Sequence, residues 1–302
     1  MKVNVYIPTL NGGKRFLELL QALAGQNLPV QHYVAVDSGS TDGTVEAARA
    51  SGFEVMGLGG TGFDHGGTRQ SAIDRYPQAD IYIFLTQDAI PADVSALTNL
   101  VRTFDDSQIG MAYGRQLPHP GATLQESHAR LFNYPPQSQV RSLADAAKYG
   151  IKTISCSNSF AAYRRTAFEE GGGFPLGTIM GEDVIMAGKL LLKGWAMAYA
   201  GDASVYHSHD YSVREEFERY FDIGVFHSDN RWIFDSFGRA DGEGFRYAKS
   251  EIRYVGRRNP LLLPKVSCSF VAKWLGYKLG LAHRSLPHAL RKAFSMYKGY
   301  WE

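Results

Sequence analysis

The first hundred residues alternate between apolar, strand-like runs and helix-like segments with apolar residues every three or four positions. We expect strands at residues 3–9, 33–36, 53–56, 81–85 and 109–113, and helices at 16–26, 44–51, 66–76 and 94–104. This order is typical of an α/β fold, a mostly parallel sheet flanked by helices and joined by right-handed crossovers. The run IYIFL at 81–85 has no polar residue, which predicts a central strand covered on both faces.

Polar residues follow three of these strands at their carboxyl ends. They are Thr9 and Asn11, Asp37, and Asp88. Ligands of open parallel sheets bind beyond the carboxyl ends of the strands. The sequence therefore predicts a ligand site at that edge.

The remaining two thirds of the chain are predicted in less detail. We expect an irregular loop over 118–150, strands at 155–163 and 204–207, and helices at 182–193 and 213–226, followed by helical sequence to the end. These patterns predict two parts, an α/β domain at 1–210 and a helical, basic C-terminal extension at 211–302.

Charge is distributed unevenly between these parts. The net charge is +2, yet residues 246–302 hold 12 Lys and Arg against 2 Asp and Glu, a charge of +10 that leaves −8 for the rest. The acidic body argues against a nucleic-acid partner. The tail also carries Trp274, Tyr277, Phe294, Tyr297, Tyr300 and Trp301. Two interpretations stay open: a helical subdomain that packs these rings on the core, or a peripheral contact with an anionic membrane.

The two cysteines, Cys156 and Cys268, lie far apart and form no CxxC pair. This pattern excludes a disulfide scaffold and a cysteine-based zinc site, and it suits a reducing compartment. The first residues are too polar for a signal peptide, and no run reaches the roughly 18 apolar residues of a spanning helix. We expect a soluble, cytoplasmic protein.

Asp37 and Thr9 end the first two strands of the predicted sheet. A carboxylate there can accept the N3–H of uracil or thymine, with Thr9 as a second hydrogen-bonding group, although Asp is also a common turn residue. The sequence after the first strand, PTLNGGKRF, lacks the GxGxxG of dinucleotide-binding enzymes. This absence disfavours a nicotinamide or flavin enzyme.

Asp88 lies in the string TQDA, directly after the most apolar strand. At the lip of the sheet its carboxylate could meet Mg²⁺ or Mn²⁺ and a diphosphate. The alternative is a turn residue ahead of the helix at 94–104, a role that Pro91 and Asp93 serve better.

Two histidines, His207 and His209, follow the strand at 204–207. Residues at i and i+2 of a strand face the same side, and a neutral imidazole is a metal ligand. No third or fourth ligand stands close in the sequence, which disfavours a zinc site. We expect one histidine to join Asp88 on a cation and the other to donate to phosphate.

Glu182 and Asp183 open the helix at 182–193. They either stabilise the helix dipole or supply a general base, and the local sequence does not decide between the two. The string FDHGGTR at 63–69 has two similar interpretations. Its backbone N–H groups and Arg69 could hold a phosphate, or it could be an ordinary helix start with a solvated arginine.

The strings PTLN, VDSGSTDGT, FDHGGTR, TQDA, GED and VYHSHDYS occur in this order over about residues 3–235. As a set they resemble the inverting GT-A glycosyltransferases of family 2, and within them the bacterial rhamnosyltransferases. VDSGSTDGT marks the broad family, whereas FDHGGTR, TQDA and HSHDYS point to rhamnosyl transfer. The resemblance implies a GT-A fold, a Rossmann-like nucleotide-binding sheet.

The resemblance also implies a role for individual residues. Thr9 and Asp37 would bind the pyrimidine base, with Asn11, Arg69 and Asp88 also at the nucleotide. Asp183 would be the general base, and Asp88 and His207 would hold a divalent cation. Glu182 and His209 are left as possible phosphate or acceptor contacts. The family's Asp-x-Asp motif is degenerate here, because Thr86 replaces its first Asp, and metal dependence is therefore an open question.

The reaction implied is transfer of L-rhamnose from dTDP-β-L-rhamnose to a saccharide acceptor, in O-antigen or exopolysaccharide synthesis. The acceptor would be linked to polyprenyl diphosphate, which gives the basic tail a reason to approach the inner face of the membrane. Three alternatives stay open: a family 2 transferase that uses a UDP-hexose, a nucleotidyltransferase, and a non-catalytic nucleotide-binding module.

Overall fold

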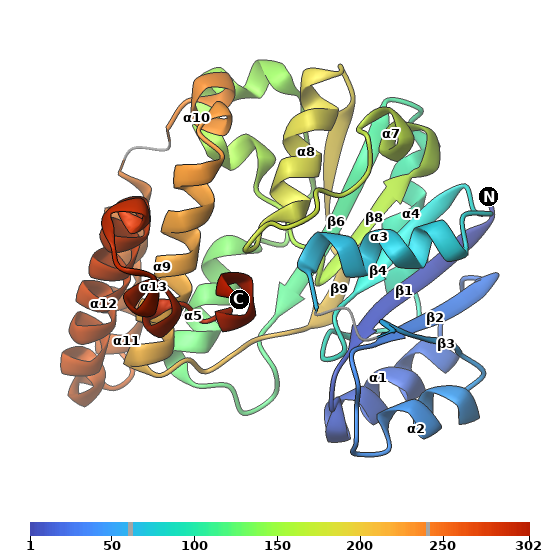
Figure 1. The fold of residues 1–302 in the computed structure, drawn as a ribbon, viewed down its shortest axis with the longest axis horizontal. Coiled ribbons are helices and arrows are strands. Elements are labelled where there is room, and N and C mark those ends of the chain that lie inside the picture. Colours follow the sequence, from blue (N-terminus) through green and yellow to red (C-terminus); the bar gives the residue numbers. More distant parts are fainter. Residues whose placement is uncertain (60–62, 240–241) are drawn as a thin grey trace.

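The computed structural model describes residues 1–59, 63–239 and 242–302. A single mixed sheet forms its centre, with the strand order β3-β2-β1-β4-β8-β6-β9-β5 and with β7 paired to β9 (Figure 1). The strands are β1 Val3–Thr9, β2 His32–Asp37, β3 Glu54–Gly57, β4 Ile81–Leu85, β5 Ile90–Pro91, β6 Ile109–Leu117, β7 Gln139–Arg141, β8 Phe160–Arg164 and β9 Ala196–Tyr206.

The parallel arrangement predicted from the first hundred residues is confirmed for β1 to β4. Strand β1 pairs in parallel with β2 and β4, and β2 pairs in parallel with β3. Strand β8 then runs antiparallel to both β4 and β6, so the sheet as a whole is mixed. The chain leaves β6 and enters β8 at the same end of the sheet, without the crossover that a parallel pair requires.

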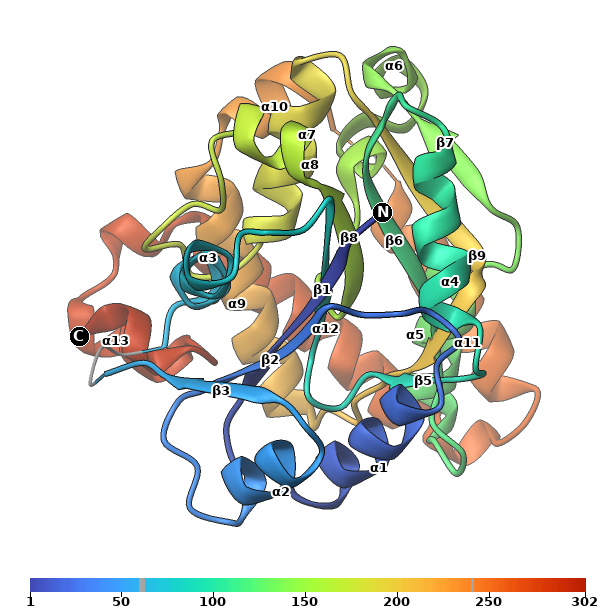
Figure 2. The ribbon, with the colours of Figure 1, turned by 90° about the vertical axis from the view of Figure 1, so that its right-hand side faces the viewer.

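Helices cover both faces of the sheet. They are α1 Gly13–Ala24, α2 Thr44–Ala50, α3 His65–Arg75, α4 Ala96–Arg102, α5 Leu124–Asn133, α6 Ala146–Tyr149, α7 Arg165–Glu170, α8 Glu182–Leu192, α9 Val213–Asp229, α10 Trp232–Phe237, α11 Glu243–Gly256, α12 Leu263–Leu281 and α13 His288–Phe294. Figure 2 shows α1 and α2 on one side of β1 to β3 and α3 on the other.

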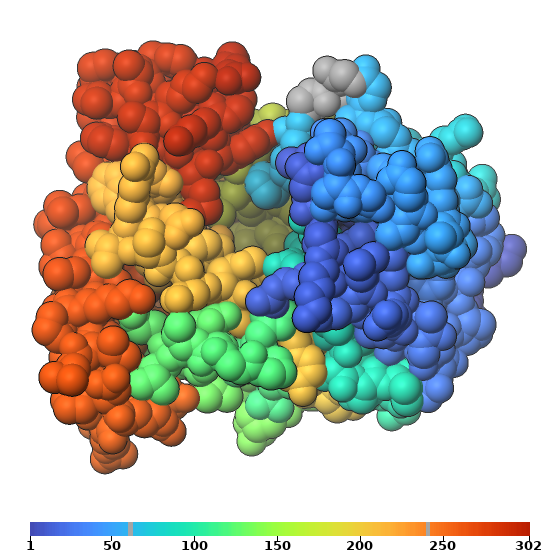
Figure 3. Space-filling view, turned by 90° about the horizontal axis from the view of Figure 1, so that it is seen from below, coloured from blue at the N-terminus to red at the C-terminus, as the bar shows by residue number. Residues whose placement is uncertain are grey.

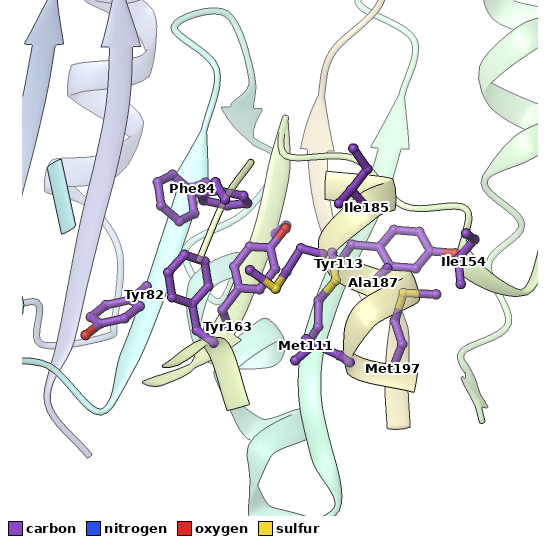
Figure 4. Packing of buried hydrophobic residues seen from close by; sticks show 14 of the residues in the cluster. Tyr82, Phe84, Met111, Tyr113, Ile154, Tyr163, Ile185, Ala187 and Met197 are labelled. Carbon is purple, nitrogen blue, oxygen red and sulfur yellow. The ribbon is translucent and has the colours of Figure 1, made fainter. Parts of the chain in front are cut away.

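Strand β4 is buried along its whole length, as its apolar sequence predicts. Ile81, Ile83 and Leu85 belong to the core cluster that α1, α2 and α4 cover. The alternate residues, Tyr82 and Phe84, belong to the opposite cluster with Tyr163 of β8 and residues of α3 and α8 (Figure 4). Because successive side chains of a strand point to opposite faces of the sheet, β4 contributes to both core clusters.

The segment 118–150 is not the irregular loop that its polarity suggests. It contains α5, which Thr123 and Glu126 begin with a capping box, and also β7, α6 and short 3₁₀ turns. The Thr-x-x-Glu spacing is a helix-start signal. The polar composition of this segment did not indicate a helix, because α5 buries little apolar surface.

The helices after residue 210 pack into the same core as the sheet. Phe221 and Val225 of α9 are fully buried there. Helix α12 lies directly on α9, at Gly276 and Gly280, where an added Cβ would come within 2.3 and 2.1 Å of carbonyl oxygens of Phe217 and Phe221. Only glycine permits this backbone approach.

Some aromatic residues of the tail pack on the core and others are exposed, so each of the two interpretations of the tail agrees with part of it. Phe294, Tyr297, Tyr300 and Trp301 pack against the core, whereas Trp274 is 54% exposed. The last segment is held by Asp222, whose carboxylate accepts hydrogen bonds from Ser295 Oγ and from the backbone of residues 296 and 297. Among the described helices, none is both long and apolar enough to cross a membrane.

Candidate active site

A cavity of about 1030 Å³ opens beyond the carboxyl ends of β1 and β4, where the sequence predicts a ligand site. Figure 3 shows the hollow between the N-terminal residues (blue) and the green, yellow and red segments of the later chain. Helix α9 contributes Arg219, Ile223, Phe226 and His227 to its wall. Residues on both sides of position 210 therefore build one site.

Three candidate metal ligands meet on one side of the cavity: Asp88, His207 and His209. One ligand atom from each lies within 4.8 Å of the others. The His207 Nε2 atom is 3.5 Å from Asp88 Oδ1, and His209 Nε2 is 3.7 Å from Asp88 Oδ2. The third group beside the two histidines is Asp88, which lies far from them in the sequence, and His209 Nε2 lies 3.1 Å from His207 Nε2. Both imidazoles therefore face Asp88, and the phosphate contact expected of one histidine stays a prediction.

The short strand β5 brings these residues together. Ile90 pairs with Tyr206 of β9, so Asp88, two residues before Ile90, and His207, one residue after Tyr206, become neighbours beyond the strand ends. A two-residue strand leaves no periodic signal in a sequence, and this pairing was not predicted.

Gln116 fixes the orientation of His207. Its Oε1 atom lies 2.9 Å from His207 Nδ1 and also accepts a hydrogen bond from Arg130 Nη1 at 2.8 Å. Because Arg130 can only donate, the oxygen of Gln116 faces both groups, and His207 carries its proton on Nδ1. The lone pair of Nε2 then points toward Asp88, as a metal ligand requires.

Burial and neighbouring charges keep Asp88, His207 and His209 in the protonation states that can bind a metal ion. Burial lowers the pKa of His207 to about 3 and also lowers the pKa of His209, so both rings are neutral. Burial alone would raise the pKa of Asp88, but the electrostatic influence of the adjacent His207 and His209 side chains outweighs it, so the pKa is lowered and Asp88 is the ionised member of the group.

Asp183 lies on the other side of the cavity, in the first turn of α8. Its carboxylate accepts hydrogen bonds from the backbone N–H of Asn158 at 2.9 Å and from that of Val184 at 2.8 Å. Burial, followed by repulsion from Glu182, raises its pKa to about 7. A carboxylate with this pKa can accept a proton near neutral pH.

Glu182 and Arg69 form a buried ion pair. The Glu182 Oε1 atom is 3.2 Å from Arg69 Nη1 and accepts a hydrogen bond from Asn158 Nδ2 at 2.9 Å. Both side chains line the cavity, but their charges are matched to each other. Of the two interpretations of Arg69, the solvated arginine is therefore wrong, and Glu182 is placed to hold Arg69 and Asn158.

The glycines of FDHGGTR serve packing at the start of α3. The Asp64 side chain caps the helix by accepting from the Gly67 N–H, which occupies one of the groups proposed for phosphate. A Cβ on Gly66 would lie 1.8 Å from the carbonyl oxygen of Pro175. The small residues thus allow α3 to contact the 175–177 backbone.

Thr9 and Asp37 lie side by side at the ends of β1 and β2, as predicted. Thr9 Oγ1 donates to Asp37 Oδ1 at 3.1 Å, and Asp37 also accepts from the side chain and backbone of Ser40. Burial alone would raise the pKa of Asp37, but the hydrogen bonds from Ser40 outweigh it and lower the pKa. Thr9 and Ser38 line the cavity, whereas Asp37 is buried and reaches it through its hydrogen bond with Thr9.

Asn11 holds two loops together. Its backbone N–H donates to Ser40 Oγ, its side-chain Oδ1 accepts from the Thr41 N–H, and its φ of 45° is left-handed. It therefore connects the loop after β1 to the loop after β2, and its contact with nucleotide stays a prediction.

Several residues of the site were missed by the sequence analysis. Gln116, Arg130 and Asn158 hold predicted residues in place, and Arg219 and His227 line the cavity from α9. No local motif marks them. The strings that contain Gln116 and Asn158 become informative only once β6 and β8 are known to end at the cavity.

Comparisons with known proteins place the chain in a family. The Glycosyl transferase family 2 model matches residues 4–172, which is more than half of the chain. The O-antigen chain rhamnosyltransferase RfbN of Salmonella typhimurium is 48% identical over 100% of this chain and 96% of its own length. The O-antigen chain rhamnosyltransferase WbaN of Salmonella anatum is 44% identical, over 98% of this chain and 94% of its own length.

Solved structures agree on the fold. Mannosyltransferase PcManGT from Pyrobaculum calidifontis, in complex with GDP-Man and Mn²⁺, has a TM-score of 0.58 at 21% identity, over 99% of this chain and 84% of that chain. Residues 1–349 of TarS from S. aureus, in complex with UDP-GlcNAc, give 0.53 at 18% identity, over 94% and 92%. Both share the mixed sheet flanked by helices expected of a GT-A fold. With the family model and the two full-length relatives, the chain is a glycosyltransferase and belongs to glycosyl transferase family 2.

Proposed function

We propose that this enzyme transfers L-rhamnose from dTDP-β-L-rhamnose to a saccharide acceptor in O-antigen synthesis, with inversion to an α-L-rhamnoside. Two relatives of 48% and 44% identity, both named O-antigen chain rhamnosyltransferases, support the sugar and the acceptor. The observation that carries the chemistry is Asp183, a cavity carboxylate whose pKa is raised to about 7.

Asp183 acts as the general base. It removes the proton from the acceptor hydroxyl while that oxygen attacks C1 of the donor sugar and the bond from C1 to the diphosphate breaks. The nucleoside diphosphate leaves with the bonding electrons, and the configuration at C1 inverts. The N–H groups of Asn158 and Val184 aim the carboxylate and leave its outer lone pairs for the acceptor.

The donor diphosphate lies, in this proposal, beside Asp88, His207 and His209. One carboxylate and two neutral imidazoles within 4.8 Å fit a divalent cation such as Mn²⁺ or Mg²⁺. When bound, such a cation supplies positive charge that stabilises the leaving diphosphate. Gln116 keeps the Nε2 lone pair of His207 turned inward for this purpose.

Metal dependence has a direct measurement. We expect protein stripped of metal to lose turnover and to regain it with added Mn²⁺ or Mg²⁺. Full activity in excess chelator would contradict the cation proposal and would assign leaving-group stabilisation to Arg69 or another cationic side chain.

A panel of dTDP- and UDP-sugars in a thermal-shift assay tests the donor, since a ligand that binds the folded state raises the melting temperature. We expect dTDP-rhamnose to give the largest shift, and Asp37→Ala to weaken dTDP and UDP alike by roughly 1–3 kcal/mol. A larger shift with a UDP-hexose would favour the alternative donor. Equal shifts with ADP-sugars would contradict selection of a pyrimidine by Asp37 and Thr9.

The polyprenyl-linked acceptor requires an approach to the membrane, and α11 and α12 provide a candidate surface. Phe245, Leu261, Val271, Trp274 and Leu275 are exposed by 76%, 86%, 52%, 54% and 42%. Exposed basic residues, Arg257, Arg258 and Lys278, belong to the same helices and the turn between them. Apolar side chains with basic neighbours suit peripheral binding to anionic lipid.

Co-sedimentation with vesicles of increasing phosphatidylglycerol content tests this surface. We expect the full-length protein to bind more as anionic lipid increases and less at high salt, and we expect Val271→Asp with Trp274→Asp to abolish binding. Leu17→Asp is the matched control, because Leu17 is 48% exposed on the distant helix α1. Equal binding of the double variant and the unmodified protein would contradict the assignment.

A further inference from the structure

A second cavity, of about 410 Å³, lies between α5, α9, α11 and α12. It adjoins the first cavity, because Arg130, Ile151, His209 and Arg219 line both. Its volume falls in the range of small-ligand sites. The mechanism above assigns it no role.

The lining of this cavity combines aromatic rings with balanced charge. The rings belong to Phe132, Tyr211, Tyr220 and Tyr247. The charged side chains are basic Arg130, Lys152, Arg219 and Lys273 and acidic Glu126, Asp210, Glu216, Glu243 and Glu251. With five acids against four bases, the cavity repels a second diphosphate and suits a neutral ligand that both donates and accepts hydrogen bonds.

One oxygen of a buried carboxylate in the cavity lacks a hydrogen-bond partner. Glu251 is 2% exposed, and its Oε1 atom makes no hydrogen bond with the described part of the chain. Such an atom costs free energy unless something bonds to it, so its presence at a cavity points to a ligand. Burial raises the pKa of Glu251, which records the same lack of solvation.

Lys273 also lines the cavity and is held in place by an ion pair. Its Nζ lies 3.0 Å from Glu216 Oε1 and 5.3 Å from the centre of the Tyr247 ring. The ammonium therefore stays charged inside the protein, with the ring face of Tyr247 beside it. Aromatic faces that adjoin charged donors and acceptors match a pyranose, which has apolar C–H faces and a rim of hydroxyls.

We propose that this second cavity is an acceptor subsite that holds neutral sugar residues of the glycan next to the one that reacts at Asp183. The assignment rests on the proposed function, which requires a saccharide acceptor, and it adds where the glycan lies. Ile151 and Arg130, which line both cavities, mark the passage between the reacting hydroxyl and the bound sugars. Glu251 accepts from a sugar hydroxyl, and a sugar face packs on Tyr247 or Tyr220.

A variant that fills the cavity gives the sharpest test. Gly244 lies at the rim, and a Cβ added there meets no atom within 4 Å. Gly244→Trp therefore blocks the cavity without disturbing the fold, and Trp is a better helix former than Gly. Lys249→Trp, an exposed position on the same helix outside the cavity lining, is the matched control for bulk. Glu251→Gln replaces the carboxylate that carries the unpartnered oxygen, with little change in shape.

Saccharide binding is measured by saturation-transfer NMR with methyl glycosides of neutral mono-, di- and trisaccharides, with and without dTDP. We expect the trisaccharide to bind at least tenfold more weakly to Gly244→Trp, several-fold more weakly to Glu251→Gln, and equally to Lys249→Trp. Binding of dTDP should be the same in all four proteins.

The subsite would be overturned by trisaccharide binding to Gly244→Trp that equals that of the unmodified protein, or by no saccharide binding to the unmodified protein. Displacement of the sugar from this cavity by inorganic diphosphate would also overturn it, in favour of an anion site. If dTDP fails to bind while saccharide binding still depends on Gly244, the subsite stands and the proposed donor is wrong.

Discussion

The two sides of the main cavity use burial in opposite directions. On the side of Asp88, His207 and His209, burial drives protons off the imidazoles, and the pKa of His207 is lowered to about 3. On the side of Asp183, burial drives a proton onto the carboxylate, and its pKa is raised to about 7. The same loss of water thus prepares ligands on one side and a base on the other.

The difference between the two sides lies in how charge is paired. Glu182 and Asp183 are adjacent carboxylates, but Arg69 and Asn158 hold Glu182 in its ionised form. Burial alone would raise the pKa of Glu182, yet Arg69 outweighs it, and the pKa is lowered. Asp183 has no such partner among the described side chains and meets only backbone N–H groups and the negative charge of its neighbour. Environments that separate two pKa values in this way assign the base to Asp183.

The largest expected effect is that of Asp183→Asn. The substitution keeps the shape and removes the basicity, so turnover should fall by roughly 10²–10⁴-fold while donor binding is spared. Initial rates with the donor at saturation measure it, and Asp105→Asn, at an exposed position, is the control. Near-normal turnover would end the assignment and make Glu182 the next candidate.

The same variant makes a prediction about pH. The rate of the unmodified enzyme should fall about tenfold for each pH unit below the pKa of about 7, and this acid limb should disappear in Asp183→Asn. Because the folded pKa lies above the ordinary value of 3.8, the folded state holds this proton more tightly than the unfolded chain. Stability contributed by Asp183 is therefore present at low pH and is lost as pH rises through 7, so the variant should gain melting temperature relative to the native protein over that window.

Glu182→Gln tests the pairing that separates the two carboxylates. It leaves the charge of Arg69 buried without a partner, which should cost roughly 3–5 kcal/mol of unfolding free energy in urea titrations. The acid limb of the rate should also move to lower pH, because the repulsion that raises the pKa of Asp183 is removed. Glu169→Gln, which breaks an exposed pair with Arg165, should change stability by less than about 1 kcal/mol. A similar cost for both variants would contradict the buried pair.

The residues at the strand ends were predicted from the sequence better than the surroundings of Asp183 were. Strand β4 is apolar throughout, Thr9 and Asp37 are the last residues of β1 and β2, and Asp88 follows β4, so their positions are consequences of parallel topology. The sequence left the glycines at 66 and 67 open between a phosphate contact and an ordinary helix start, because the backbone contact of Gly66 with Pro175 depends on a loop more than a hundred residues away. Contacts of this kind leave no periodic pattern.

The partners of the site residues were predicted least. His209 joins Asp88 only because the two-residue strand β5 pairs with β9, and Gln116 reaches His207 only because β6 also pairs with β9. Asn158 contacts both Glu182 and Asp183 from the loop before β8. Each is an ordinary polar residue whose role comes from tertiary pairing, which single-sequence patterns do not encode.

Gln116→Leu makes the smallest expected change, and it separates orientation from ligation. Leucine has nearly the same size and lacks the oxygen that fixes the proton of His207 on Nδ1. His207 can then turn or change tautomer, and its Nε2 lone pair no longer points to Asp88. Residues that orient ligands typically affect metal affinity or activity by about 10–100-fold. We therefore expect Mn²⁺ affinity, measured by calorimetry, to decrease by a factor in that range, with turnover partly restored by excess Mn²⁺.

Asp183→Asn is the control: it should bind Mn²⁺ normally, and its turnover should not respond to excess metal. If Gln116→Leu loses turnover that excess Mn²⁺ does not restore, Gln116 acts on the donor itself, and the two sides of the cavity are less separate than their pKa values indicate.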